Sequence, residues 1–556
     1  MHNPLKLSPF IFCFFFAFTA ASSQQLTLKI SGKTGRENKV IDSISYKKAH
    51  PDLKSLKTEM TVFHENMVRA GYIECEIGSP EKINDTVYRY NTSLGNRTKS
   101  IVVYTNAAWR KQIPEFKEDA AEINFNTIEA FLKKTVSFFE RQGYALAKVK
   151  LVHFEKKGDA LYAELIADLG KKRELNDIVI KGYEKFPQGH LLNIKKLYRK
   201  KTFNQENLKN IYGDFEKFRF VKQTKYPEIL FTKDTTKVYV YLEKATPNKF
   251  EGFIGFSNDE KSNVKLNGYL DLQLVNILNS GEEFSLYWKS DGEDQKTFNL
   301  GLELPYIFKS KLGLKTYLNI FKQDSTFQNT RTAIDLGYLF NYNTRTYIGY
   351  QSSESSDIQN QNNASISDYK NAFITADFEY VDFKSDQFLF PENTRLTVKI
   401  GKGSRTSKLE NNSQYFINAD IMHNFYLDKN NSISLRSQDY YLKSKNYIIN
   451  ELYRFGGINS VRGFNENSLQ ANLFASILTE YRYQLASNLY AHSIIDYGHF
   501  DDSTSGNKGS LLGLGFGFGL LTKNGLLHLV YANGSANHQE IKLSNSIIHI
   551  SFKTNF

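Results

Sequence analysis

The last residues of the chain, 548–556, read Ile-His-Ile-Ser-Phe-Lys-Thr-Asn-Phe and carry the clearest structural pattern of the sequence. Apolar and polar residues alternate from Ile548 to Lys553, which is the period of a β-strand. In a membrane barrel this alternation turns one set of side chains toward lipid and the other toward the lumen. The segment therefore predicts a strand of a transmembrane β-barrel.

The same pattern of strand-length alternating segments extends back to about residue 248. Beyond that point helical periodicity and proline nearly vanish. The chain contains 34 Tyr and 43 Phe, and aromatic residues suit strands and the interfacial girdles of membrane barrels. With about 10 residues per strand plus turns, residues 248–556 fit an even number of strands near 16. The polar stretch Ser352–Asn362 is expected to be an extracellular loop. A soluble β-sandwich or propeller is the alternative.

Residues 512–520 alternate apolar residues with glycine, as Leu-Gly-Leu-Gly-Phe-Gly-Phe-Gly-Leu. A phosphate-binding loop would need a following helix and a Lys-Ser/Thr pair, which this segment lacks. We interpret it as a strand with an apolar lipid face and no side chains on the inward face. Because glycine weakens a strand, the run predicts that another segment packs closely against the inner wall.

The N-terminus has the features of a secretory signal peptide, expected over residues 1–23. Lys6 supplies the positive charge, Phe10–Phe18 is a short apolar run, and small residues follow at 20–23. No later stretch approaches the roughly 18 apolar residues of a membrane helix. The mature chain keeps Cys75 alone, so an intrachain disulfide is excluded and a buried apolar role is expected.

The preceding part of the chain alternates strands with amphipathic helices in three segments of similar rhythm. Helices expected at 58–70 and 126–142 are followed by Gly71 and Gly143, and glycine after the last helical turn is typical of a helix C-terminus. Two strands follow each helix. We expect three small α/β units ahead of the barrel, over residues 24–99, 100–172 and 173–247, with the barrel at 248–556.

The positive charge lies mainly in this N-terminal half. Residues 26–247 hold 41 Lys and Arg against 28 Asp and Glu, a net of +13, whereas residues 248–556 hold 29 against 31, a net of −2. Nucleic acid is a poor partner for an exported chain without a nucleic-acid-binding motif. A basic face suits anionic lipid headgroups or an acidic client segment, and an ordinary solvated surface is the alternative.

Patterns for bond chemistry are missing from the sequence. The eleven His are scattered, and neither a G-x-S-x-G turn, nor an H-E-x-x-H helix, nor a clustered acidic pair occurs. We therefore expect no enzyme activity, no catalytic residue, no bound metal and no cofactor.

One motif resembles a known family. Val461-Arg462-Gly463-Phe464, within "LYRFGGINSVRGFNENSL" (452–469), resembles the VRGF/Y motif of the BamA/TamA-like superfamily of outer-membrane insertases and transporters. In that family the motif lies at the tip of a long loop folded back into the barrel. The segments 478–500 and 513–532 resemble family motifs in the same order. The terminal Phe556 resembles the family's insertion signal, at the barrel seam.

The resemblance also implies partners for the motif arginine. An Arg carried into a barrel lumen needs a carboxylate, or its charge stays uncompensated in a confined site. The family pattern supplies Glu480 and Asp496, on neighbouring strands. The three α/β units in turn resemble POTRA domains, the periplasmic modules ahead of such barrels, and a generic periplasmic α+β domain is the alternative.

The resemblance implies a protein of the outer membrane with its N-terminal half in the periplasm. It implies unfolded outer-membrane or secreted client proteins, outer-membrane lipid and periplasmic accessory proteins as partners. Clients would be captured by strand addition to the α/β units and assembled at a seam between the first and last barrel strands. A dedicated exporter for one partner protein and a passive pore are the other functions that the sequence leaves open.

Overall fold

The computed structural model describes residues 25–556 except 117, 159, 259–263, 291–294, 364, 385–388, 409, 524, 538, 541–545 and 556, with backbone alone at 253–258, 264–267 and 555. The expected signal peptide at 1–23 and the terminal Phe556 lie outside the described residues. The chain divides into two compact units, residues 1–172 and 173–556. Among the helices described, none combines the length and apolar character needed to cross a membrane.

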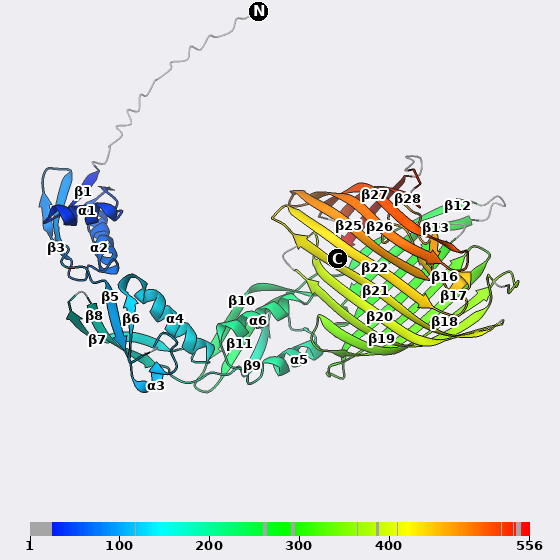
Figure 1. The fold of residues 1–556 in the computed structure, drawn as a ribbon, viewed down its shortest axis with the longest axis horizontal. Coiled ribbons are helices and arrows are strands. Elements are labelled where there is room, and N and C mark those ends of the chain that lie inside the picture. Colours follow the sequence, from blue (N-terminus) through cyan, green and yellow to red (C-terminus); the bar gives the residue numbers. More distant parts are fainter. Residues whose placement is uncertain are drawn as a thin grey trace, which may run out of the picture. The chain divides into compact units, whose positions relative to one another are not determined.

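The first compact unit holds two α/β modules of the same topology (Figure 1). In each, the first and last strands pair in parallel at the centre of the sheet, and the third strand pairs antiparallel with the last. The first module consists of β1 (Leu26–Gly32), α1 (Gly35–Ser43), β2 (Ala49–His50), α2 (Leu53–Arg69), β3 (Glu76–Lys82) and β4 (Val87–Ser93).

The second module repeats this order. Its sheet has the order β6-β5-β8-β7, so that the short β6 is an outer strand. The helix α4 buries Phe131, Thr135 and Phe139 against the sheet. The module consists of β5 (Ser100–Tyr104), α3 (Ala107–Arg110), β6 (Ala120–Asn124), the 3-10 turn η1 (Phe125–Thr127), α4 (Ile128–Arg141), β7 (Lys148–Lys157) and β8 (Ala160–Asp168).

The glycines after α2 and α4 end these helices as the sequence predicts. Gly71 and Gly143 have φ of +98° and +100°, a conformation that is easy for glycine and strained for other residues. The amide of the following tyrosine then donates to a carbonyl five residues back, from Tyr72 to Met67 and from Tyr144 to Phe139. This arrangement is the Schellman motif, which satisfies carbonyls at the helix end.

The third module belongs to the second compact unit. Its sheet has the order β10-β11-β9, with β9 and β11 parallel, and its second helix buries Leu208, Ile211 and Phe215. The module consists of β9 (Asp177–Lys181), α5 (Gln188–Tyr198), α6 (Gln205–Glu216), β10 (Val221–Phe231) and β11 (Thr236–Lys244).

Several elements of the modules differ from the sequence expectation. The first and second modules each contain an additional short helix and an additional edge strand, α1 with β2 and α3 with β6. The first of the two strands expected after α2 begins only at Glu76, because residues 70–75 complete the turn after α2. Short edge strands escape sequence patterns because they have too few residues to show a period.

Sixteen antiparallel strands form a closed barrel, which confirms the predicted fold class (Figure 1). Neighbouring strands pair in sequence order, interrupted only by the long segment between β22 and β25. The strands are β12 (Lys249–Asn258), β13 (Val264–Val275), β14 (Glu283–Ser290), β15 (Gln295–Ile307), β16 (Leu312–Gln323), β17 (Phe327–Leu339), β18 (Thr344–Asp357), β19 (Tyr369–Phe383), β20 (Glu392–Ser407), β21 (Asn411–Tyr426), β22 (Asn431–Lys443), β25 (Leu473–Ala486), β26 (Leu489–Asp502), β27 (Asn507–Thr522), β28 (Gly525–Ala536) and β29 (Ile547–Asn555).

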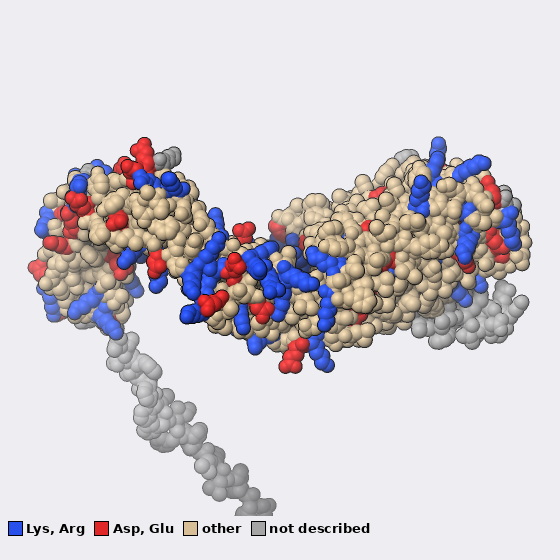
Figure 2. All heavy atoms as spheres, turned by 90° about the horizontal axis from the view of Figure 1, so that it is seen from below, with Lys and Arg blue, Asp and Glu red and all other residues tan. Residues whose placement is uncertain are grey.

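Alternation along the strands separates an apolar outer face from a polar inner face. On β26, Ile495 and Tyr497 are exposed on the outside, whereas Asp496 between them is fully buried. On the face that Figure 2 shows, the outer wall of the barrel carries few charged side chains between its two ends. This outer surface suits a hydrocarbon environment, in which a barrel satisfies its backbone by closing on itself.

The prediction of a loop at Ser352–Asn362 is partly wrong. Residues 352–357 belong to β18, which pairs with β19 as far as Ser355. Ser353, Ser355 and Asp357 are buried. A strand end with buried polar residues of this kind lacks the apolar alternation by which the sequence reveals lipid-facing strands.

The third module packs against one end of the barrel through an aromatic joint. His190 of α5 is fully buried among Phe218, Phe220, Tyr306 and Tyr342. Neither ring nitrogen of His190 has a hydrogen-bond partner among the described residues. The β13–β14 turn closes over the ring, with Gly281 so near that a Cβ at this position would overlap it.

Polar contacts surround the aromatic joint. The Asn276 amide donates to the Tyr183 hydroxyl at 2.9 Å. Arg219 donates to Glu283 at 3.3 Å and to Gln273 at 3.0 Å. The joint therefore fixes the third module to the first strands of the barrel.

We predict that this joint weakens as the pH falls. Burial, together with the nearby Arg345, lowers the pKa of His190 to about 3. A released His190 regains a pKa near 6.5 and binds a proton that the packed ring excludes, so falling pH favours release between about pH 6.5 and 3. In the full chain, hydrogen exchange of α5, corrected for the intrinsic effect of pH, should accelerate over this range. His190→Leu should remove the dependence, and an unchanged dependence in that variant would contradict it.

Candidate functional site: the inner loop and the barrel seam

The segment between β22 and β25, residues 444–472, folds back against the inner wall of the barrel and is called the inner loop here. It contains the 3-10 turn η2 (Ile449–Glu451) and a short hairpin of β23 (Tyr453–Phe455) and β24 (Leu469–Ala471). Four consecutive residues at its tip, Ser460 to Gly463, are buried.

Arg462 makes the densest set of contacts in the inner loop. Its Nε donates to Asp496 Oδ2 at 2.8 Å, and its Nη2 contacts Asp496 Oδ1 at 2.5 Å. The Arg462 amide donates to the same carboxylate at 2.9 Å, and Nη1 pairs with Glu480. The structure thus brings together all three residues that the sequence analysis grouped, and the paired geometry is the strong, bidentate form of this interaction.

Glu480 also receives a second arginine. Arg482, two residues along β25, donates Nε to Glu480 Oε2 at 2.7 Å and Nη1 to Asn424 of β21 at 3.0 Å. The cluster therefore holds two guanidinium groups and two carboxylates, so that its formal charges cancel. Cancellation of this kind is needed where charges are withdrawn from water.

The other residues of the motif shape the tip of the loop. Val461 is fully buried with Phe455, Phe474 and Leu511. Gly463 has a φ of +89°, and a Cβ at this position would overlap the backbone of Asn533 in β28. Phe464 is partly buried beside this cluster. Position 463 requires a positive φ and leaves no room for a Cβ beside Asn533. Glycine is therefore the residue that allows the tip to approach β28.

The glycine face of β27 provides room for the loop. A Cβ at Gly513 would overlap the carbonyl oxygen of Arg462, and one at Gly517 would overlap His492. Phe516 and Phe518, on either side of Gly517, are exposed on the outer wall. The close inner packing predicted from the glycine run is therefore present.

Two further anchors of the inner loop were missed in the sequence. Glu451 pairs with Arg405 of β20, and both side chains are almost completely buried. Next to them, the Asn450 amide donates to Ser355 Oγ at 2.7 Å and to the Ser367 carbonyl at 2.9 Å. No local motif marks these partners, because the paired residues lie far apart in sequence.

The second missed anchor is Glu466, just after the motif. It pairs with Lys289 of β14 and accepts a hydrogen bond from the Tyr287 hydroxyl at 3.0 Å. In the barrel, β29, β12 and β13 lie between β28 and β14. The inner loop therefore contacts strands on both sides of the junction between the first and last strands.

That junction, called the seam here, is short. The strands β12 and β29 pair through Lys249 with Asn555, Phe250 with Thr554, and Glu251 with Lys553. By contrast, β12 pairs with β13 along its whole length, from Lys249 to Asn258. The seam thus closes the barrel with fewer described backbone pairs than its neighbour. Phe556, expected at this seam, lies outside the described residues.

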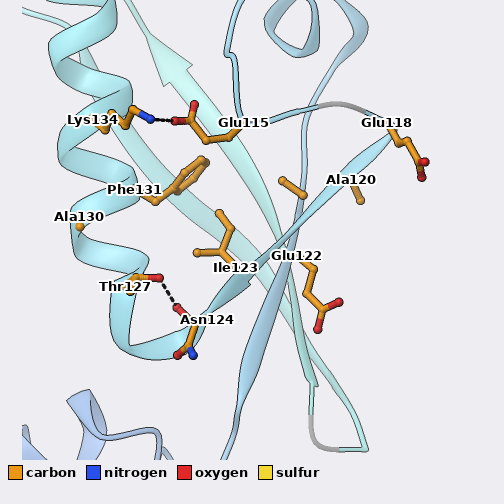
Figure 3. A pocket seen from close by; sticks show the side chains of 11 residues that line it. Glu115, Glu118, Ala120, Glu122, Ile123, Asn124, Thr127, Ala130, Phe131 and Lys134 are labelled. Atoms are coloured by element: carbon orange, nitrogen blue, oxygen red, sulfur yellow. Dashed lines mark hydrogen bonds and ion pairs between the residues drawn. The ribbon is translucent and has the colours of Figure 1, made fainter.

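The second module carries a groove beside its outer strand (Figure 3). The groove has a volume of about 640 Å³ and lies between β6 and α4. Phe131 and Ile123 form part of its wall, and Lys134 pairs with Glu115 across it at 2.5 Å. An outer strand beside an open groove suits an extended peptide, which adds to the strand and places alternate side chains in the groove. The sequence analysis missed β6 and this groove.

Groups of three or more residues suited to hold a metal ion do not occur among the described residues.

A search of curated proteins finds no match. Solved structures with a similar fold include CdiB from Escherichia coli (13% identity, TM-score 0.50, covering 90% of this chain and 97% of that one) and CdiB from Acinetobacter baumannii (12%, 0.50, 90% and 97%). BamA from Haemophilus ducreyi lacking POTRA domains 1–3 is also similar (14%, 0.48, 82% and 99%).

The family comparison agrees with the geometry of the barrel and inner loop. The Omp85 superfamily domain matches residues 276–551, which include the VRGF motif, both carboxylate partners and the glycine face. The chain is therefore a member of the Omp85 superfamily, with three α/β modules ahead of a 16-stranded barrel.

Proposed function

We propose that the chain is an outer-membrane insertase or translocase that assembles or exports client proteins without bond chemistry. The α/β modules, residues 24–99, 100–172 and 173–247, would face the periplasm, and residues 248–556 would span the outer membrane. The observation that carries this proposal is the combination of a short seam with an inner loop that is anchored on both sides of it.

The seam supplies a place where a client strand can pair. A barrel strand in lipid must pair its backbone groups, because each unsatisfied group costs several kcal/mol there. If the three pairs between β12 and β29 separate, both edges become templates for a strand from the client. The inner loop would then keep the remaining strands in place while the seam opens.

The groove of the second module supplies a place for clients to arrive. The outer edge of β6 offers backbone groups for strand addition, and its groove takes alternate side chains. Glu115, Glu118 and Glu122 lie among the lining residues, so client segments without clustered acidic residues should bind best.

A passive pore is less consistent with this arrangement. The inner loop buries its tip against β26, β27 and β28 instead of leaving the inner wall open to solvent. The dedicated exporter for one partner protein stays a candidate, because it would use the same barrel and loop.

The proposed function is tested by depleting the protein in its native host and quantifying the outer-membrane proteome. We expect a broad loss of β-barrel proteins if the chain is a general assembly factor. Loss of one or a few surface proteins, with other barrels intact, would identify a dedicated exporter. An unchanged proteome would contradict both.

Arg462→Ala tests the role of the ion cluster. Removing the guanidinium leaves Asp496 and part of Glu480 uncompensated, at a cost of about 3–5 kcal/mol. We expect lost function and a folded barrel that converts to its heat-unfolded gel form at a lower temperature. Arg462→Lys should recover little, because an ammonium lacks the bidentate geometry. Lys508→Ala, at the exposed start of β27, is the control. Normal function and normal heat-modifiable migration of the Arg462 variant would refute this role.

The contact between Glu466 and Lys289 is tested by exchanging its charges. Glu466→Lys and Lys289→Glu should each lower the temperature of heat-induced unfolding, because each places like charges in contact. The double variant should recover most of the loss, since it restores an ion pair with reversed orientation. The relevant comparison is the double-mutant cycle, measured on gels with unboiled samples. Additive losses in the double variant would show that the contact does not support the barrel.

A further inference from the structure

A second cavity lies where the third module meets the barrel, on the outer side of the wall. It has a volume of about 280 Å³ and is formed by both helices of the module and by the β15–β16 and β17–β18 turns. These turns lie at the same end of the barrel as the third module, which enters at β12. The lining residues include Lys196, Leu197, Lys217, Lys311, Phe340 and Tyr342.

Exposed apolar residues of the outer wall lead up to the cavity. On β17, every second residue toward the turn is apolar and exposed, ending with Tyr338 and then Phe340 at the cavity. Leu197 of α5 is also exposed, and Phe308 in the β15–β16 turn is 93% exposed. Apolar side chains this exposed are consistent with a hydrocarbon surface around them. The cavity therefore lies at the boundary between that surface and water.

The cavity also carries positive charge that the protein does not compensate. Lys217 is paired with Asp214 at 2.7 Å, and the Tyr198 hydroxyl also donates to Asp214. Lys196 and Lys311 line the cavity without a carboxylate within 4.0 Å among the described residues. The Lys311 Nζ lies 5.6 Å from the centroid of the Tyr338 ring and donates to the Phe340 carbonyl at 3.4 Å.

The surroundings add to this charge. Residues 173–247 hold 16 Lys and Arg against 9 Asp and Glu, and Figure 2 shows these cations gathered over the third module. An anion near the cavity therefore meets a positive field from the whole module as well as from the two lysines.

We propose that this cavity binds the headgroup of an anionic phospholipid of the inner leaflet. Lys196 and Lys311 contact the phosphate, and the acyl chains follow Tyr338 and Phe340 along the outer wall. The inference rests on the proposed placement of the barrel in the outer membrane. It adds a lipid contact that fixes the third module at the membrane surface, beside the barrel turns against which His190 packs.

The test counts lipids retained by the full chain after extraction from vesicles of phosphatidylglycerol and phosphatidylcholine, using native mass spectrometry. Lys196→Gln combined with Lys311→Gln should reduce phosphatidylglycerol retention about 30-fold, from roughly fivefold for each lysine near an anionic surface. The matched control is Lys209→Gln with Lys233→Gln, which removes the same charge at exposed positions outside the cavity. The control should retain phosphatidylglycerol as the unmodified chain does.

Three outcomes would overturn the proposal. The first is equal phosphatidylglycerol retention by the cavity variant and the control, and the second is retention of phosphatidylcholine by the unmodified chain equal to that of phosphatidylglycerol. The third is displacement of phosphatidylglycerol by millimolar inorganic phosphate, which would identify a free-phosphate site. Heat-modifiable migration checks that the cavity variant is folded. Because the readout involves no client, a failed lipid site leaves the proteome test unaffected. If the chain retains phosphatidylglycerol as proposed but depletion leaves the outer-membrane proteome unchanged, the proposed function is rejected and the lipid site is not.

Discussion

The structure of the barrel interior depends on the placement of one charge, the guanidinium of Arg462. A guanidinium cannot give up its proton to escape burial, so the barrel must supply carboxylates where the loop tip rests. Both carboxylate oxygens of Asp496 accept hydrogen bonds from the guanidinium, and Glu480 forms a second ion pair with it. Gly513 of β27 follows from the same constraint, since a side chain there would overlap the carbonyl oxygen of Arg462.

Anchoring of the loop has a consequence for the seam. The inner loop is held by buried ion pairs at Arg405 and Asp496, and it reaches β14 through Glu466. These contacts connect strands on both sides of the junction between β12 and β29 from within the lumen. A barrel with few backbone pairs at one junction can therefore stay closed at rest and still separate there. Separation breaks only the few pairs between β12 and β29, and the other strands stay hydrogen-bonded to their neighbours.

How much the sequence predicted depended on how local each signal was. The period of two, the glycine face and the helix-ending Gly71 and Gly143 are local patterns, and the structure contains all of them. The partners of Arg462 followed from the family resemblance alone. By contrast, β6 has five residues and no period, and Glu451 and Glu466 find partners 46 and 177 residues away. Such pairings are set by the register of the closed barrel, which no local window of sequence contains.

The central claim is that the seam opens during function, and a disulfide across it tests this most directly. Phe250→Cys with Thr554→Cys, at paired positions and in a Cys75→Ser background, would join β12 to β29. The control pair Leu272→Cys with Leu286→Cys joins β13 to β14 in the same way. Our account predicts that oxidation blocks client assembly in the seam variant alone and that a reductant restores it. Full activity with the seam joined would contradict the account.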